Sequence, residues 1–135
     1  MKIYVPRDAA ARALGADAVA AAVLAEAAKR GVTVELVRNG SRGMVWLEPL
    51  VEVVTDKGRV GFGPMTLADV PALFGDLAAH PKALGLTEDL PWLKAQTRLT
   101  FARVGVIDPL SLADYRAHGG LTGLDRALGM APADM

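Results

Sequence analysis

The chain contains no cysteine in 135 residues, which excludes disulfide bonds, thiol redox catalysis and thiolate-ligated metal sites. Aromatic residues are scarce, at 5 % of the chain. A net charge is also missing, because fifteen Lys and Arg residues balance fifteen Asp and Glu residues. Nucleic-acid binding normally depends on an excess of basic residues. We therefore expect no nucleic-acid partner.

Long apolar runs are absent as well, and none approaches the roughly 20 residues that cross a bilayer. We therefore expect no membrane partner. The start of the chain, residues 1–6, is too short and too β-like for a signal peptide, which predicts a cytoplasmic location. Apolar residues nevertheless make up 52 % of the chain. That content and this length predict one packed domain with an extension.

The first 80 residues follow the order β-α-β and then β-β-α. A helix over residues 17–30 has an apolar face and closes at Gly31. A second helix, from Thr66 to about Leu77, begins with a Thr66–Asp69 capping box and contains Pro71, which predicts a late start or a bend. Strands are expected over residues 3–5, 32–37, 50–55 and 59–62, the last two joined by a three-residue loop, Asp56-Lys57-Gly58.

This order predicts an α/β (α+β) fold, namely a thioredoxin-like domain with a four-stranded mixed sheet and flanking helices. We expect Tyr4, Val23, Leu36 and Val53 to share a single interior. The domain is predicted to span residues 1–79.

Residues 80–95 are predicted to be a linker, because His80-Pro81 and Leu90-Pro91 disfavour helix before each proline. Residues 96–135 form the third predicted region. It is expected to contain a strand over residues 98–104, a helix from Ser111 to His118 that Gly119-Gly120 ends, and a short helix over residues 121–128.

The loop Ser41–Pro49 and the strand after it resemble the Cys-x-Gly-x-Cys…Pro loop of thioredoxin-like 2Fe–2S ferredoxin domains. Ser41 and Val45 stand at the two cysteine positions. In that family another cysteine pair follows the first strand, and the matching positions here are Pro6 and Ala11. Iron–sulfur clusters are held mainly by thiolates. We therefore expect no metal site in this degenerate domain.

Residues 96–128 resemble the opening of the flavin-bearing, NADH-oxidising subunit of respiratory complex I. The resemblance rests on a G-x-I-D-P segment, Gly105 to Pro109, and a Y-x-x-x-G-G-x-x-x-L segment, Tyr115 to Leu124. A cysteine-less thioredoxin-like domain ahead of this opening is the layout of the β subunit of soluble NAD-dependent formate dehydrogenases. The resemblance spans nearly the whole chain, but only the front of the family's protein.

The resemblance implies an N-terminal structural and subunit-docking portion of an oxidoreductase subunit. Its partners would be the cluster-bearing γ subunit and the molybdenum- or tungsten-bearing α subunit. FMN, NAD and 4Fe-4S clusters would belong to the full-length subunit, so we expect no cofactor and no catalysis from these 135 residues alone. Two alternatives stay open: a free-standing, cluster-less thioredoxin-like binding module, and the same region of a related NAD-linked hydrogenase.

Three residues of the Ser41 loop are candidate subunit contacts. Arg38 and Arg42 flank Ser41 and are expected to form a surface pair, which is either simply solvated or docks a partner. Trp46 is either a core residue or an anchor for a neighbouring subunit.

Other features have a structural explanation, and no catalytic residue is predicted. Ser41 has no nearby histidine base, so its hydroxyl is expected to satisfy the backbone of a turn. His80 is assigned to the linker and His118 to a helix C-terminus. Asp108-Pro109 is expected to form a turn, and Tyr115 to pack on its helix. The Gly61-Phe62-Gly63 segment lacks the third glycine of a dinucleotide-binding turn.

Overall fold

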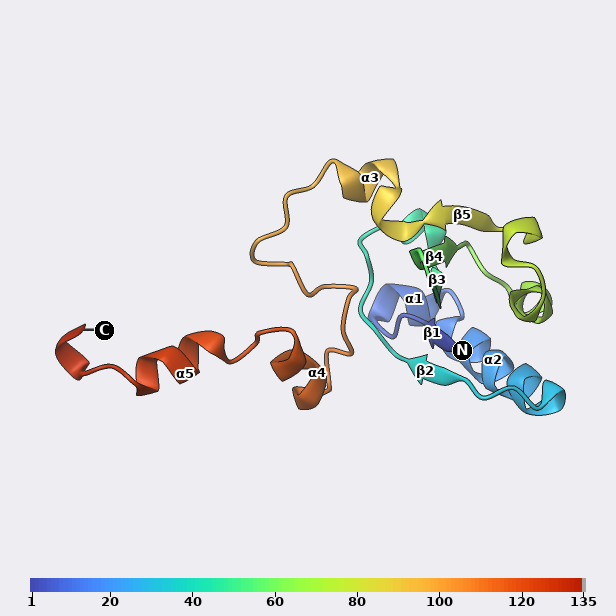
Figure 1. Ribbon diagram of the computed structural model, residues 1–135. Coiled ribbons are helices and arrows are strands. Elements are labelled where there is room, and N and C mark those ends of the chain that lie inside the picture. The colour runs from blue at the N-terminus through green and yellow to red at the C-terminus, as the bar shows by residue number, and fades with distance from the viewer. Residues whose placement is uncertain (135) are drawn as a thin grey trace.

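The computed structural model describes residues 1–134; Met135, the last residue of the predicted third region, lies outside the described residues. Five strands form one mixed sheet with the order β2-β1-β3-β4-β5 (Figure 1). The strands are β1 (Lys2–Tyr4), β2 (Glu35–Val37), β3 (Val51–Thr55), β4 (Gly58–Phe62) and β5 (Ala83–Leu86). The α/β class is therefore confirmed, and the predicted count of four strands is wrong.

The α-helices are short apart from α2. They are α1 (Ala9–Ala13), α2 (Ala16–Arg30), α3 (Pro91–Lys94), α4 (Leu112–Ala117) and α5 (Thr122–Leu128). The 3-10 helices are η1 (Val45–Leu47), η2 (Leu67–Phe74), η3 (Leu77–Ala79), η4 (Thr87–Asp89) and η5 (Pro132–Asp134). None of the helices in residues 1–134 combines the length and hydropathy that a membrane span requires.

Strands β1 and β2 are parallel and joined through α2, whereas β3, β4 and β5 add to β1 as successive antiparallel neighbours. The helix predicted over residues 17–30 is confirmed, and Gly31 ends it at a φ of 65°. That left-handed conformation suits a residue without a Cβ. The hairpin between β3 and β4 is tighter than predicted: Thr55 pairs with Gly58, so only two residues form the loop.

The capping box at Thr66 is confirmed, since the backbone nitrogen of Thr66 donates to Asp69 Oδ2 at 2.9 Å. The element that follows is the 3-10 helix η2 and not an α-helix. Pro71 lies inside it and has no N–H with which to continue an α-helical ladder. A tighter, shorter helix results.

The main core fills one face of the sheet, between the sheet, α2 and η2. Ile3, Val53 and Val23 are fully or almost fully buried there, with Leu36 packed against them. Tyr4 is buried too, but it pairs with Glu52, whereas Ile3 pairs with Val53. Successive strand residues point to opposite faces, so the expectation that Tyr4 shares this interior is wrong.

The opposite face of the sheet carries a second, smaller core made by the predicted linker. Leu93 of α3 packs with Met44 and Leu50, and Leu84 and Leu90 pack against the same cluster. Residues 80–95 therefore contain β5, η4 and α3 and cover the sheet, which corrects their assignment as a linker. Strand β5 was not predicted from the sequence, because Gly85, at a φ of 88°, interrupts the apolar pattern.

The carboxyl-terminal residues form an arm that extends away from the sheet (Figure 1). We call residues 108–134 the arm. The strand predicted over residues 98–104 is wrong, because residue 99 forms a bend and residues 100–106 form turns. Helix α4 is confirmed, with Ser111 Oγ accepting from the Asp114 nitrogen at 3.1 Å, and so is α5.

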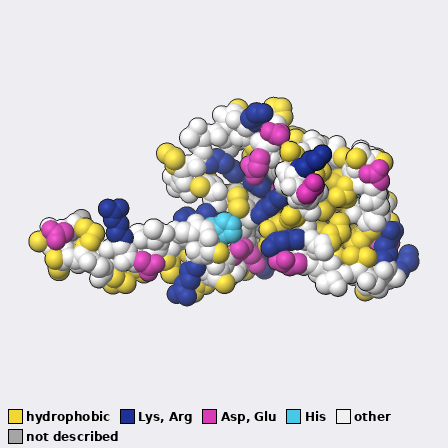
Figure 2. Space-filling model, viewed as in Figure 1, with side chains coloured by type: hydrophobic (Ala, Val, Ile, Leu, Met, Phe, Trp, Pro, Cys, Tyr) yellow, Lys and Arg dark blue, Asp and Glu magenta, His cyan; other side chains and the backbone are white. Residues whose placement is uncertain are grey.

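Apolar side chains are exposed along the arm and the loop before it (Figure 2). The most exposed is Leu99, at 83 %. The large apolar residues exposed there are Leu99, Phe101, Val104, Leu110, Leu112, Tyr115, Leu124, Leu128 and Met130.

Candidate functional site

The loops that follow β1 and β2 run side by side, as the carboxyl ends of neighbouring parallel strands must. The Arg7 nitrogen donates to the Asn39 carbonyl at 2.9 Å. Both loops carry the positions that the family resemblance matches to cluster ligands. This edge of the sheet is therefore where a cluster would have to bind.

The four matched positions offer no ligand set for iron. Pro6 is buried, Ala11 is fully buried in α1, and Val45 is half exposed in η1. Only Ser41 has a side-chain heteroatom, and its hydroxyl donates to Glu48 Oε1 at 2.7 Å. Within residues 1–134, no three His, Asp or Glu side chains gather in a way that could hold a metal ion. The residues do not fit an iron–sulfur cluster.

Ser41 and Glu48 instead accept hydrogen bonds from backbone nitrogens of their own loop. Ser41 Oγ accepts from the Gly43 nitrogen at 3.0 Å, and Glu48 Oε2 accepts from the Leu50 nitrogen at 2.9 Å. Burial raises the pKa of Glu48, and these hydrogen bonds from Leu50 and Ser41 only partly oppose that rise. The prediction that the Ser41 hydroxyl satisfies the turn is confirmed.

A buried ion pair lies behind this loop, between Arg42 and Glu52 of β3. Arg42 Nε donates to Glu52 Oε1 at 3.0 Å and Nη2 donates to Oε2 at 2.9 Å, with only 2 % and 0 % of the two side chains exposed. Burial alone would lower the pKa of Arg42, but the hydrogen bonds and charge of Glu52, helped by Glu88, outweigh it and raise the pKa. Arg42 Nη1 also lies 2.8 Å from Glu88 Oε1.

Arg42 is therefore not a surface residue, and the expected surface pair of arginines is wrong. Arg38 is also engaged: its guanidinium donates to the carbonyls of Val5 and Pro6 at 3.1 Å and to Asp17 Oδ1 at 2.6 Å. The Arg38 hydrogen bond, with that of Arg12, holds the pKa of Asp17 below its usual range. Both arginines brace the loops, Arg42 from the interior and Arg38 from a partly exposed position.

Trp46 takes the opposite position, on the surface. It is 59 % exposed, which excludes the core alternative. Its ring meets that of Trp92 edge to face, with the centroids 5.4 Å apart, and Trp92 is 52 % exposed. We call these two side chains the tryptophan pair. Sequence reasoning missed Trp92 because it lies in the segment assigned as a linker.

Both histidines have structural roles. His80 is buried: its Nδ1 accepts from the Lys82 nitrogen at 3.0 Å, so its Nε2 is free to donate to the Asp69 carbonyl at 3.1 Å. Its ring meets Phe62 edge to face. The linker assignment of His80 is wrong. His118 lies at the C-terminus of α4 as predicted.

The remaining predicted features are turns and packing. Asp108 Oδ1 accepts from the Leu110 nitrogen at 2.9 Å, which makes the expected turn. Tyr115 packs against Gly120, where a Cβ would overlap the Tyr115 ring. The Gly61-Phe62-Gly63 segment leads into Pro64 and is buried, so it presents no phosphate-binding turn.

An open hollow of about 630 Å³ lies beside Ser41 and Gly43, under residues 96–101 and Val104. Its wall is mainly apolar and includes Leu99 and Phe101. Arg98 supplies the charged group in this wall.

A scan against protein-family models returned no matching family, and a search of curated proteins returned no match.

Proposed function

We propose that this chain is an N-terminal structural and docking portion of the NADH-oxidising flavoprotein subunit of an NAD-dependent formate dehydrogenase. It would act in the cytoplasm and position the flavin-bearing part of the subunit against the cluster-bearing γ subunit and the molybdenum- or tungsten-bearing α subunit. FMN, NAD and 4Fe-4S clusters belong, on this proposal, to the rest of the subunit. The same region of an NAD-linked hydrogenase is the close variant of this proposal.

The main support for the proposal is the arrangement of residues at the carboxyl ends of β1 and β2. The order β2-β1-β3-β4, with β1 and β2 parallel and β3 reversed, is the one expected of a thioredoxin-like domain. The segments that follow these two strands hold all four positions matched to cluster ligands, Pro6 and Ala11 after β1 and Ser41 and Val45 after β2, and none of them carries a thiol. A scaffold retained without its ligands favours a role in assembly.

Exposed apolar groups supply surfaces for that role. The tryptophan pair and the leucines of the arm are uncovered, and tryptophans are frequent anchors in protein interfaces. Arg38 and Arg42 are occupied within the domain and contribute no free charge. Docking through the tryptophan pair would therefore rest on apolar contact.

The test is reconstitution with the γ subunit, and separately with the α subunit, of an NAD-dependent formate dehydrogenase, followed by native mass spectrometry and titration calorimetry. We expect a one-to-one complex, and we expect Trp46→Ala to weaken it at least about tenfold, as a central aromatic anchor does. Leu24→Ala is the matched control, because Leu24 is a comparably exposed apolar residue on α2. A folded chain that binds neither the γ nor the α subunit contradicts the proposal.

A second candidate, a free-standing thioredoxin-like binding module, is favoured by one observation. Gly105 and Ile107 are buried against the rest of the chain, as a self-contained protein would require. Limited proteolysis with mass analysis separates the two candidates. Rapid cleavage within residues 96–104 and loss of the arm favour the subunit portion, whereas a resistant, monodisperse full chain favours the free-standing module.

A further inference from the structure

The main-chain carbonyls of Gly105 and Val106 accept hydrogen bonds from side chains in two distant parts of the sequence. Asn39 Nδ2 donates to the Gly105 carbonyl at 2.7 Å. Arg59 of β4 donates to the same carbonyl through Nη1 at 3.3 Å and to the Val106 carbonyl through Nη2 at 2.8 Å. Two consecutive carbonyls thus face a guanidinium and an amide.

Other side chains of the domain hold Arg59 in place. Glu52, fully buried, holds Arg42 and lies 3.7 Å from Arg59 Nη1. The Arg59 guanidinium also stacks on the Tyr4 ring, 3.5 Å from its centroid. We call Asn39, Arg42, Glu52 and Arg59 the socket. A donor set held in this way loses little conformational freedom when it binds.

The segment that enters the socket is shaped to fit it. Gly105 has a φ of 77°, and a Cβ at this position would overlap the aliphatic part of the Arg42 side chain. Only glycine can hold both the conformation and the close approach. Two residues later Ile107 is buried, with 6 % exposed, which anchors the segment beyond the hydrogen bonds.

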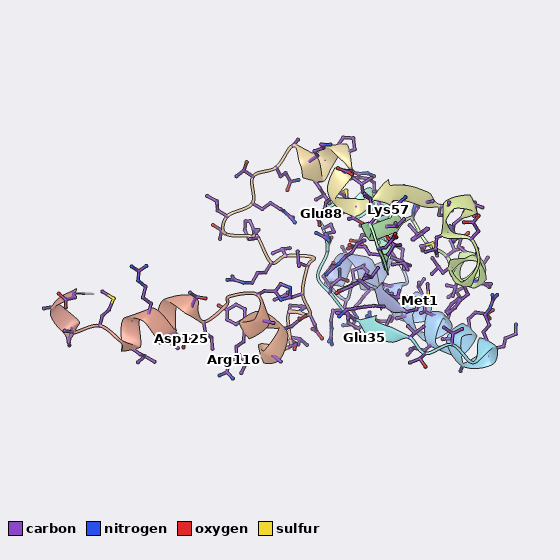
Figure 3. All side chains as sticks on the ribbon, in the orientation of Figure 1. Met1, Glu35, Lys57, Glu88, Arg116 and Asp125 are labelled. Carbon is purple, nitrogen blue, oxygen red and sulfur yellow. The ribbon has the colours of Figure 1, made fainter. Side chains whose placement is uncertain are left out.

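We propose that the socket is a binding site for the main chain of residues 105–107, and that it sets the direction in which the arm leaves the sheet. Asn39 and Arg59 bind two successive carbonyls, and Gly105 is the residue that makes the segment fit the socket. Beyond Ile107 the chain turns into α4 and α5 with the exposed leucines, and Arg116 and Asp125 lie on this outer part (Figure 3). The arm is thereby presented in one orientation from a fixed root. This inference goes beyond the proposed function and does not depend on the family assignment.

Hydrogen exchange measured by mass spectrometry on the full chain tests the socket from both sides. Arg59→Met removes the guanidinium and keeps a stem of similar length, whereas Gly105→Ala changes only the segment that is bound. In each variant we expect peptides covering residues 103–111 to exchange about tenfold faster or more, the effect of losing one or two charge-assisted hydrogen bonds. Peptides covering β3 and β4 should stay within about threefold of the unsubstituted chain in Gly105→Ala, because local opening leaves the core strands protected.

Arg116→Met is the matched control, because the Arg116 guanidinium has no hydrogen bond within residues 1–134 and the chemical change is the same. It should leave the exchange of residues 103–111 unchanged. If Arg59→Met unfolds the whole domain, Gly105→Ala decides. The proposal is overturned if residues 103–111 exchange at the rate of an unstructured peptide in the unsubstituted chain, or if Gly105→Ala leaves their exchange unaltered.

Discussion

Replacing Glu52 by Gln should be the most destabilising single polar substitution in the Ser41 loop and the strand behind it. The change removes the charge that Arg42 faces but keeps the shape of the side chain. Glu52 is fully buried and receives two hydrogen bonds from Arg42, at 3.0 and 2.9 Å. Removing one partner of a buried ion pair costs about 3–5 kcal/mol, because the other charge stays buried without compensation.

We expect a value at the lower end of that range, because Arg42 keeps a second carboxylate, Glu88, at 2.8 Å. Glu88 is 71 % exposed and screened by water, so it compensates for the lost charge only in part. We therefore expect a loss of about 3 kcal/mol in the free energy of unfolding. A domain of this size has roughly 7–20 kcal/mol in total, so the variant should still fold.

Urea denaturation followed by circular dichroism measures this change. With a slope of about 2 kcal/mol per molar urea, a loss of about 3 kcal/mol lowers the midpoint by about 1.5 M. Glu88→Gln is the control, since it removes the exposed partner of the same arginine and should cost about 1 kcal/mol or less. Equal midpoints for Glu52→Gln and Glu88→Gln would refute the reasoning that burial makes the Glu52 pair indispensable.

Two further substitutions test the loops on either side of this pair. Burial raises the pKa of Glu48 above its ordinary value of 4.5, so the folded state favours the protonated carboxyl. The stability that this group contributes is fully present below pH 4.5. It is lost as the pH rises through the raised pKa of the folded state. The melting temperature of the unsubstituted chain minus that of Glu48→Gln should therefore fall as the pH rises from about 4.5, and a difference that grows with pH would contradict this assignment. Asp8 caps α1, its Oδ1 accepting from the Ala10 and Ala11 nitrogens at 3.1 and 3.2 Å, so Asp8→Ala should cost about 0.5–2 kcal/mol in urea denaturation; no change in the midpoint would show that the cap contributes nothing.

Elements with a complete local signal were predictable from the sequence. Helix α2 has its apolar face, its charge order and its closing Gly31 within one stretch of chain, and the Thr66 capping box lies within four residues. Strand β5 has no such signal, because Gly85 interrupts it and only the pairing with β4 makes it a strand. Local patterns identify elements that are stable through their own residues.

The burial of Arg42 could not be predicted from its neighbours. Its partner is ten residues away on the far side of a cis Glu48–Pro49 peptide, and only the sheet brings the two together. One signal was available: Glu52 is a single charge among Leu50, Val51, Val53 and Val54, and a charged residue within an apolar strand needs a buried partner. His80 is the same case, since its more distant partners Asp69 and Phe62 come next to it only through folding.

Ser41, Arg42 and Glu48 of the loop after β2 have their hydrogen-bond partners within the domain, and this limits how that loop can recognise a partner. None of the three therefore offers a free charge or a metal ligand. Trp46 and Val45 of the same loop face outward, and both are apolar. Interfaces of this kind depend on burial of aromatic surface, whereas exposed charges mainly govern the rate and salt dependence of association. If the loop after β2 docks a partner, we therefore expect recognition to come mainly from the tryptophan pair.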